Sequence, residues 1–311
     1  LDKNIGLDLT LLNNRLNVNL DYYDKLTDPL LAAVSVPSSV GSKRVMTNVG
    51  SQRTQGVSGT VKYSPVYHPE ERINWTLSAS FKHQKAKYED IGNSLDQFNK
   101  ENLNTSLVRY YDGGSPTALW AVRSLGINPS DGRELFLTKE GTYTFEYDTE
   151  DEVVVGNSEP KLEGVLGSTL YWKGFSFSLY FRYSLGADVF TEATYNKVEN
   201  ISLAGLKSNQ DKRALHDRWQ KPGDHAKFKG ISLTETTPIS SRFVLRENYI
   251  KAESISVGYD FESQAVQKLG IQSLRLQANT TDLFRISSIK EERGIEYPFA
   301  RSFSFSLQVT F

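Results

Sequence analysis

Hydrophobic and polar residues alternate with a strict period of two in nine segments of the chain. The C-terminus shows this most clearly, because the odd-numbered positions from Phe303 to Phe311 are apolar while the even-numbered ones between them are polar. Successive side chains of a β-strand point to opposite faces, so each segment predicts a strand with one apolar and one polar face. The nine segments are 5–11, 16–22, 57–63, 73–81, 162–172, 175–183, 255–261, 274–278 and 303–311. The pattern therefore predicts an all-β fold, and no segment has a convincing helical period.

Short turns and long loops alternate between these predicted strands. Short turns are expected at 12–14, 65–71, 173–174 and 262–270, and long loops at 27–50, 89–158, 187–240 and 282–300. An antiparallel up-and-down transmembrane β-barrel has this rhythm, with tight periplasmic turns and long extracellular loops. The apolar faces should then contact outer-membrane lipid, the polar faces should line the lumen, and Phe311 should end on the periplasmic side.

The composition argues against two classes of protein, those that bind nucleic acid and those that span a membrane with helices. The 311 residues include 36 Lys and Arg against 37 Asp and Glu, so no basic surface is expected for nucleic acid. The longest apolar run is the five residues from Leu30 to Val34, far short of the ~20 that a membrane-spanning helix needs. The mean hydropathy of −0.44 does not exclude a β-barrel, because half of each strand faces a polar lumen.

Aromatic residues gather at both ends of the predicted strands, where their rings suit a membrane interface. The expected periplasmic girdle is Tyr63, Tyr171, Trp172, Phe175, Tyr259 and Phe311, and the expected outer girdle is Tyr22, Tyr23, Phe81, Tyr183 and Phe303. Nine strands is an odd number, and the first strand begins in the middle of its pattern. We therefore expect the chain to be the C-terminal piece of a larger barrel, since an open sheet leaves unpaired edges in lipid.

Several segments in this order resemble the C-terminal barrel region of SusC/RagA-type TonB-dependent outer-membrane transporters. The matching segments are 47–59 (TNVGSQRTQGVSG), 120–137 (WAVRSLGINPSDGRELFL), 154–183, 217–228 (DRWQKPGDHAKF), 240–261, 274–284 and 294–311 (GIEYPFARSFSFSLQVTF). Together they cover nearly the whole chain, although each alone is a weak signal.

The resemblance implies more than the periodicity does. Residues 1–311 would supply about nine C-terminal strands of a 22-stranded barrel, without the plug domain and the TonB box. Such transporters import glycans or oligopeptides, with a SusD-like surface lipoprotein as a lid and energy delivered through TonB. No cofactor is expected for this chain. The terminal Phe311 is similar to the signal that the barrel-assembly machinery recognises.

The loop 89–158 holds the candidate ligand-binding residues. Its aromatic residues Tyr110, Tyr111 and Trp120 are candidates for stacking on sugar rings, and packing within the loop or against a lid lipoprotein is the alternative for each. The loop also contains the hairpin signal Glu134 to Leu137 and Thr142 to Tyr147. The aromatic residues of the loops slightly favour glycan over peptide as cargo.

No motif indicates catalysis or a metal site. The four histidines lack zinc-binding spacing, and 128–132 (NPSDG) is better explained as a turn than as a calcium loop. Nucleophile-elbow, phosphate-loop and dinucleotide motifs are absent, so we predict that the protein is not an enzyme. The lumen-facing Arg182, Arg275, Lys62 and Lys82 are expected to pair with neighbouring residues.

Two alternatives remain open at this stage. One is a stand-alone structural or adhesive barrel of ten strands, closed by a strand hidden in loop 89–158; the mid-pattern start and the lack of a signal sequence count against it. The other is a soluble β-sandwich binding module, whose apolar faces would meet in a core.

Overall fold

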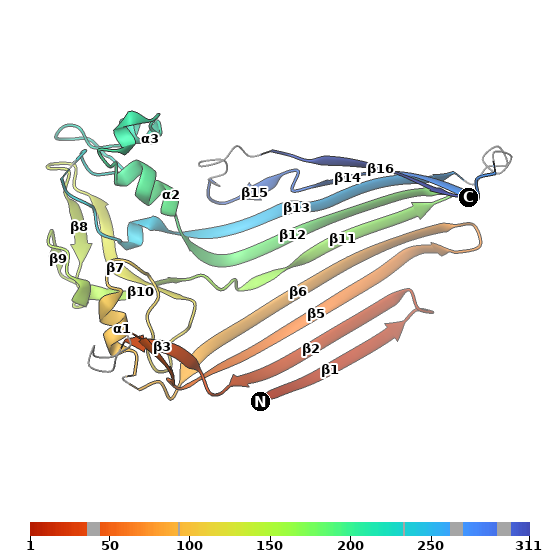
Figure 1. Cartoon of the computed structure of the whole chain (residues 1–311), viewed down its shortest axis with the longest axis horizontal. Coiled ribbons are helices and arrows are strands. Elements are labelled where there is room, and N and C mark those ends of the chain that lie inside the picture. The colour runs from red at the N-terminus through yellow and green to blue at the C-terminus, as the bar shows by residue number, and fades with distance from the viewer. Residues whose placement is uncertain (36–43, 93, 233, 262–269, 291–299) are drawn as a thin grey trace.

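The computed structural model describes residues 1–35, 44–92, 94–232, 234–261, 270–290 and 300–311. Nine long strands form one sheet in sequence order, each antiparallel to the next (Figure 1). They are β1 (Asp2–Leu11), β2 (Leu16–Thr27), β5 (Ser51–His68), β6 (Ile73–Glu89), β11 (Leu162–Trp172), β12 (Phe175–Phe190), β13 (Val244–Phe261), β14 (Ser273–Thr281) and β16 (Phe303–Thr310). The short β15 (Arg285–Ser287) pairs with β13. The nine predicted strands and their up-and-down order are confirmed, and β1 and β16 form the two edges of the sheet.

The apolar face of this sheet is uncovered. Ile5 is 74% exposed and Phe305 82% exposed, and the same face continues through Leu7, Leu166 and Leu307. Within the described residues, no second sheet packs on this face. A soluble sandwich would bury these side chains between two sheets, so that alternative is wrong. A face of this kind is suited to lipid.

Several strands are longer than their sequence pattern predicted. β5 runs through Pro65 to His68 with a register shift between Tyr63 and Val66, so the predicted turn 65–71 is reduced to residues 69–72. A bulge leaves one residue out of the ladder, which lets proline remain in a strand. The predicted turn 262–270 lies largely outside the described residues, as does much of loop 282–300.

The long loops carry structure of their own at one end of the sheet (Figure 1). A second sheet has the order β10-β7-β8-β9, and the hairpin of β3 and β4 stands apart from it. The elements are β3 (Leu31–Ser35), β4 (Arg44–Asn48), α1 (Asp96–Glu101), β7 (Ala118–Ile127), β8 (Glu134–Leu137), β9 (Tyr143–Thr144), η2 (Thr149–Asp151), β10 (Glu152–Asn157), α2 (Glu192–Thr194), η3 (Tyr195–Glu199), η4 (Gly205–Lys207), α3 (Arg213–His216) and η5 (Ser241–Phe243).

This second sheet settles two expectations from the sequence. β8 and β9 pair at Phe136↔Thr144, which confirms the predicted hairpin. Strand β7 of loop 89–158 pairs with β8 and β10 rather than with the main sheet, so among the described residues this loop does not supply the tenth wall strand that the stand-alone alternative required. The short helices were not predicted, because three to six residues are too few to show a helical period. Among the described residues, no helix has the length and apolar character needed to cross a membrane.

The buried core lies in the loops rather than in the main sheet. Three clusters of buried apolar residues form it, centred on Ile91, Ala121 and Phe243. Phe190 and Tyr195 pack against both of the last two clusters, which joins loop 89–158 to loop 187–240. The loops are therefore a packed body that the strands carry at one end.

One aromatic position differs from the predicted outer girdle. Tyr23 lies on the polar face, opposite Tyr22, and its hydroxyl donates to Gln84 Oε1 at 2.8 Å. The ring crosses Gly56, where a Cβ atom would lie 2.4 Å from it, so only glycine leaves room for this contact. Tyr23 therefore links strands β2 and β6 on the polar face. Its place in the aromatic girdle was predicted wrongly.

Ion pairs between neighbouring strands line the polar face. Arg182 pairs with Glu253 at 2.9 Å, Lys82 with Glu163 at 3.4 Å, and Arg275 with Asp260 at 3.3 Å. This confirms the predicted pairing for three of the four cations. The described residues contain no ion pair of Lys62.

Candidate functional site

A groove of about 1030 Å³ opens in the loop body, and it brings together two of the predicted ligand-binding residues. Trp120 lies in β7 and Tyr111 in the segment before that strand. Their ring centroids are 5.1 Å apart and the rings are tilted by 54°. The pair offers a continuous aromatic surface to the groove, on which a sugar ring or a planar side chain can stack. That role remains a prediction.

Tyr110, the third predicted residue, points elsewhere. Its ring packs against Tyr88 at 5.5 Å and against Phe98 at 5.4 Å, beside the cluster around Ile91. Its backbone exchanges two hydrogen bonds with the Asn99 side chain, at 2.9 and 2.8 Å. Tyr110 thus packs within the loop, whereas its neighbour Tyr111 faces the groove.

A buried ion pair positions the aromatic pair. The Arg109 guanidinium donates to both Glu152 carboxylate oxygens, at 2.9 and 2.7 Å, and the two side chains are only 1% and 9% exposed. Arg109 also donates to the carbonyl oxygens of Ser106 and Val108. A buried charge needs such a full set of partners. Together with the 2.7 Å bond from Trp120 N to Leu107 O, this holds segment 106–111 against β7 and β10.

Acidic side chains dominate the rest of the groove. Glu140, Asp148, Glu150 and Asp151 line it, and Lys139 is the one basic side chain among the lining residues. Asp148 Oδ1 accepts from Glu150 N and Asp151 Oδ1 from Lys139 N, both at 2.9 Å. These bonds fix the backbone of the groove wall and leave carboxylate oxygens for further hydrogen bonds.

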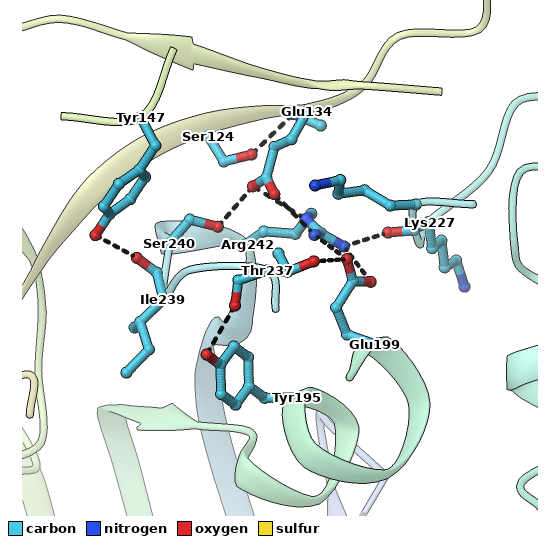
Figure 2. A network of polar contacts seen from close by, with 12 residues as sticks. Ser124, Glu134, Tyr147, Tyr195, Glu199, Lys227, Thr237, Ile239, Ser240 and Arg242 are labelled. Atoms are coloured by element: carbon cyan, nitrogen blue, oxygen red, sulfur yellow. Dashed lines mark hydrogen bonds and ion pairs between the residues drawn. The ribbon is translucent and has the colours of Figure 1, made fainter. Parts of the chain in front are cut away.

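Beside the groove, a second buried network ties the loops together (Figure 2). Arg242 Nη2 donates to Glu134 Oε2 at 2.9 Å and to Glu199 Oε1 at 3.0 Å. The Ser240 hydroxyl donates to Glu134 at 2.6 Å and the Thr237 hydroxyl to Glu199 at 2.9 Å. The Glu134 and Glu199 side chains are 1% and 0% exposed. The network joins β8, η3 and η5, which belong to two different loops.

Tyrosine hydroxyls extend this network. Tyr147 donates to the Ile239 carbonyl oxygen at 3.1 Å, and Tyr195 donates to the Thr237 carbonyl oxygen at 2.8 Å (Figure 2). Burial raises the pKa of both phenols above the usual value. No sequence signal indicated this network, because its members lie far apart in the chain and follow no motif.

The segment 217–228 is tied to neighbouring loop residues by hydrogen bonds. Arg218 is 5% exposed and donates to carbonyl oxygens of Ala214 at 3.1 Å and Lys229 at 2.7 Å. Trp219 Nε1 donates to Pro129 O at 3.0 Å, and the indole lies over Gly132. Gly132 has φ +74° and no space for a Cβ, so the NPSDG turn is shaped to receive Trp219. In the described part of the chain, no group of three potential metal ligands converges.

Comparisons with known proteins agree with this architecture. The family model described as TonB dependent receptor-like, beta-barrel, matches residues 2–190. TonB-dependent receptor P39 of Formosa agariphila is 24% identical over 92% of this chain and 31% of its own length. TonB-dependent receptor SusC of Bacteroides thetaiotaomicron is 24% identical over 99% of this chain and 31% of its own length.

Solved structures show the same fold. The RagAB peptide importer in its closed-closed state superposes with a TM-score of 0.79 at 19% identity, over 100% of this chain and 35% of that chain. Its open-open state gives a TM-score of 0.77. This chain thus spans about a third of the length of the relatives that it matches.

Proposed function

The chain belongs to the TonB-dependent receptor-like β-barrel family, and from this premise we propose that it forms part of the wall and the outer loops of an importer driven through TonB. The family resides in the bacterial outer membrane, and so does this protein. The observation that carries the proposal is the sheet of nine strands whose apolar face is uncovered and whose polar face is lined by ion pairs. Such a sheet separates lipid from an aqueous lumen.

The proposed partners follow from the family. A plug and a TonB-contacting segment would lie in the part of a complete transporter that this chain does not span, and TonB would supply energy through them. A SusD-like surface lipoprotein would cover the loop body from outside. The barrel-assembly machinery would recognise the last strand, β16, and Phe311 after it. The family is one of transporters rather than enzymes, and we assign the chain no catalytic step.

The groove with Tyr111 and Trp120 is the proposed capture site for glycan or oligopeptide cargo. Its volume of about 1030 Å³ lies at the upper end of the range for small-molecule pockets, which suits a segment of an oligomer. The aromatic pair supplies apolar contact, and the carboxylates supply hydrogen-bond acceptors.

Replacing Trp120 in the complete transporter tests this proposal. Trp120→Ala removes one of the two aromatic rings, and loss of about 1.4 kcal/mol of contact energy corresponds to about tenfold weaker capture. Tyr143→Ala is the matched control, because Tyr143 is 73% exposed on the nearby β9 and does not line the groove. Cargo binding and uptake should fall for Trp120→Ala alone, while the amount of assembled barrel stays the same in both variants. Equal binding by both variants would remove the groove as the capture site.

A further inference from the structure

The groove beside Tyr111 and Trp120 carries a local excess of negative charge. Four carboxylates line it against one ammonium group, that of Lys139, and the fifth carboxylate, Glu152, is neutralised by Arg109. The whole chain, in contrast, has a formal charge of only −1. The excess is therefore a property of this groove and does not reflect an acidic protein.

These carboxylates are available to a ligand. Glu140 and Glu150 are exposed, and the described residues contain no hydrogen bond or ion pair of either side chain. Asp148 and Asp151 each use one oxygen for a backbone N–H group, which leaves the other oxygen available. Four acceptors near one another repel an anion and attract a cation that can pair with them.

The aromatic pair adds a second attraction for the same kind of group. An ammonium or guanidinium group over the face of Trp or Tyr is favoured by ~0.5–1 kcal/mol at exposed sites. Trp120 and Tyr111 lie in the same groove as the four carboxylates. A cationic side chain can therefore place its stem or its charged plane on the rings while its charge faces the acidic wall.

We propose that the groove selects oligopeptide cargo that presents Lys or Arg side chains or a free amino terminus. The inference rests on the proposed function and specifies the cargo of the same site. Neutral glycan chains would gain the stacking contact and hydrogen bonds from their hydroxyls to the carboxylates, but no charge attraction, and glycans with carboxylate or sulfate groups would be repelled.

Matched probes test this selection in the complete transporter with its lipoprotein partner. Two fluorescent peptides of equal length and sequence would differ only in Lys or Gln at three positions, and a neutral oligosaccharide would be the third probe. The Lys peptide should bind about tenfold more tightly than the Gln peptide at low ionic strength. The difference should shrink as salt is added, because exposed charges are screened within about 10 Å at 0.1 M salt.

Charge-neutralising variants identify the groove as the cause. The double variant Glu140→Gln, Glu150→Gln should lower the preference for the Lys peptide about three- to tenfold. Glu146→Gln is the matched control, because Glu146 is exposed in the same loop but does not line the groove. The Glu146→Gln variant should keep the full preference for the Lys peptide over the Gln peptide.

The outcomes separate this inference from the proposed function. Equal binding of the Lys and Gln peptides, or tighter binding of the oligosaccharide, overturns the charge selection, while a loss of capture in Trp120→Ala still supports the groove as the capture site. A preference for the Lys peptide that survives in the double variant also overturns the inference, because the selecting charge then lies elsewhere.

Discussion

Replacing Arg242 should loosen the loop body without affecting the barrel wall. Arg242 contacts both Glu134 and Glu199, and it also donates to the Lys227 carbonyl oxygen at 2.7 Å. In Arg242→Met the two carboxylates keep only hydroxyl partners, from Ser240 and Thr237, at positions with almost no solvent contact.

The expected cost follows from leaving buried charges unpaired. Removing one partner of a buried ion pair destabilises a protein by about 3–5 kcal/mol. Local opening of the loop body should therefore become about two to four orders of magnitude more frequent. Arg246→Met is the matched control, since Arg246 pairs with Asp188 but its side chain is 54% exposed. Solvent-exposed ion pairs contribute only about 0–1 kcal/mol to the free energy of unfolding.

Hydrogen exchange measured by mass spectrometry on the purified transporter reports this opening. Amide protection should fall in segments 195–200 and 234–243 of Arg242→Met and stay unchanged in strands β5 and β6. Adding Glu134→Gln and Glu199→Gln to the same variant should restore much of the protection, because neutral side chains cost less to bury. Unchanged protection in Arg242→Met, or an equal loss in Arg246→Met, would refute the argument that the buried carboxylates hold the loops together.

Two further predictions concern the last strand and a buried phenol. Deleting Phe311 should reduce the amount of protein inserted in the outer membrane, as read by immunoblotting of outer-membrane fractions, and normal levels would contradict its role as an assembly signal. For Tyr147, burial raises the folded-state pKa above the unfolded value of about 10, so its contribution to stability is complete below pH 10 and is lost as pH rises beyond it. Tyr147→Phe should lower the protection of the Ile239 segment by ~1 kcal/mol at neutral pH and flatten its decline above pH 10, as followed by hydrogen exchange; an unchanged alkaline decline would contradict this.

The wall of the barrel was predictable from the sequence because its determinants are local. A strand with lipid on one side and water on the other must alternate every second residue, and this pattern survives in β16 and in all eight other wall strands. The hairpin of β8 and β9 was predictable for a similar reason, since turn residues lie between two strand-like segments. The ends of the strands were less accurate, because β5 continues through Pro65 and β13 begins at Val244, beyond the alternating region.

The site itself required the tertiary structure. Composition alone treats Tyr110 and Tyr111 alike, yet the backbone turns one ring into the cluster around Ile91 and the other into the groove. Trp120 was singled out from the sequence, but its pairing with Tyr111 at 5.1 Å was not.

The amino-acid sequence by itself determined which nine segments form the wall strands and that each has one apolar and one polar face, because a period of two needs only neighbouring residues. The tertiary structure decided how the loops are held and what the groove offers to cargo. Glu134 and Arg242 are 108 residues apart, and Arg109 and Glu152 are 43 apart. Such contacts depend on how two distant segments fold back on each other, and no local pattern records that.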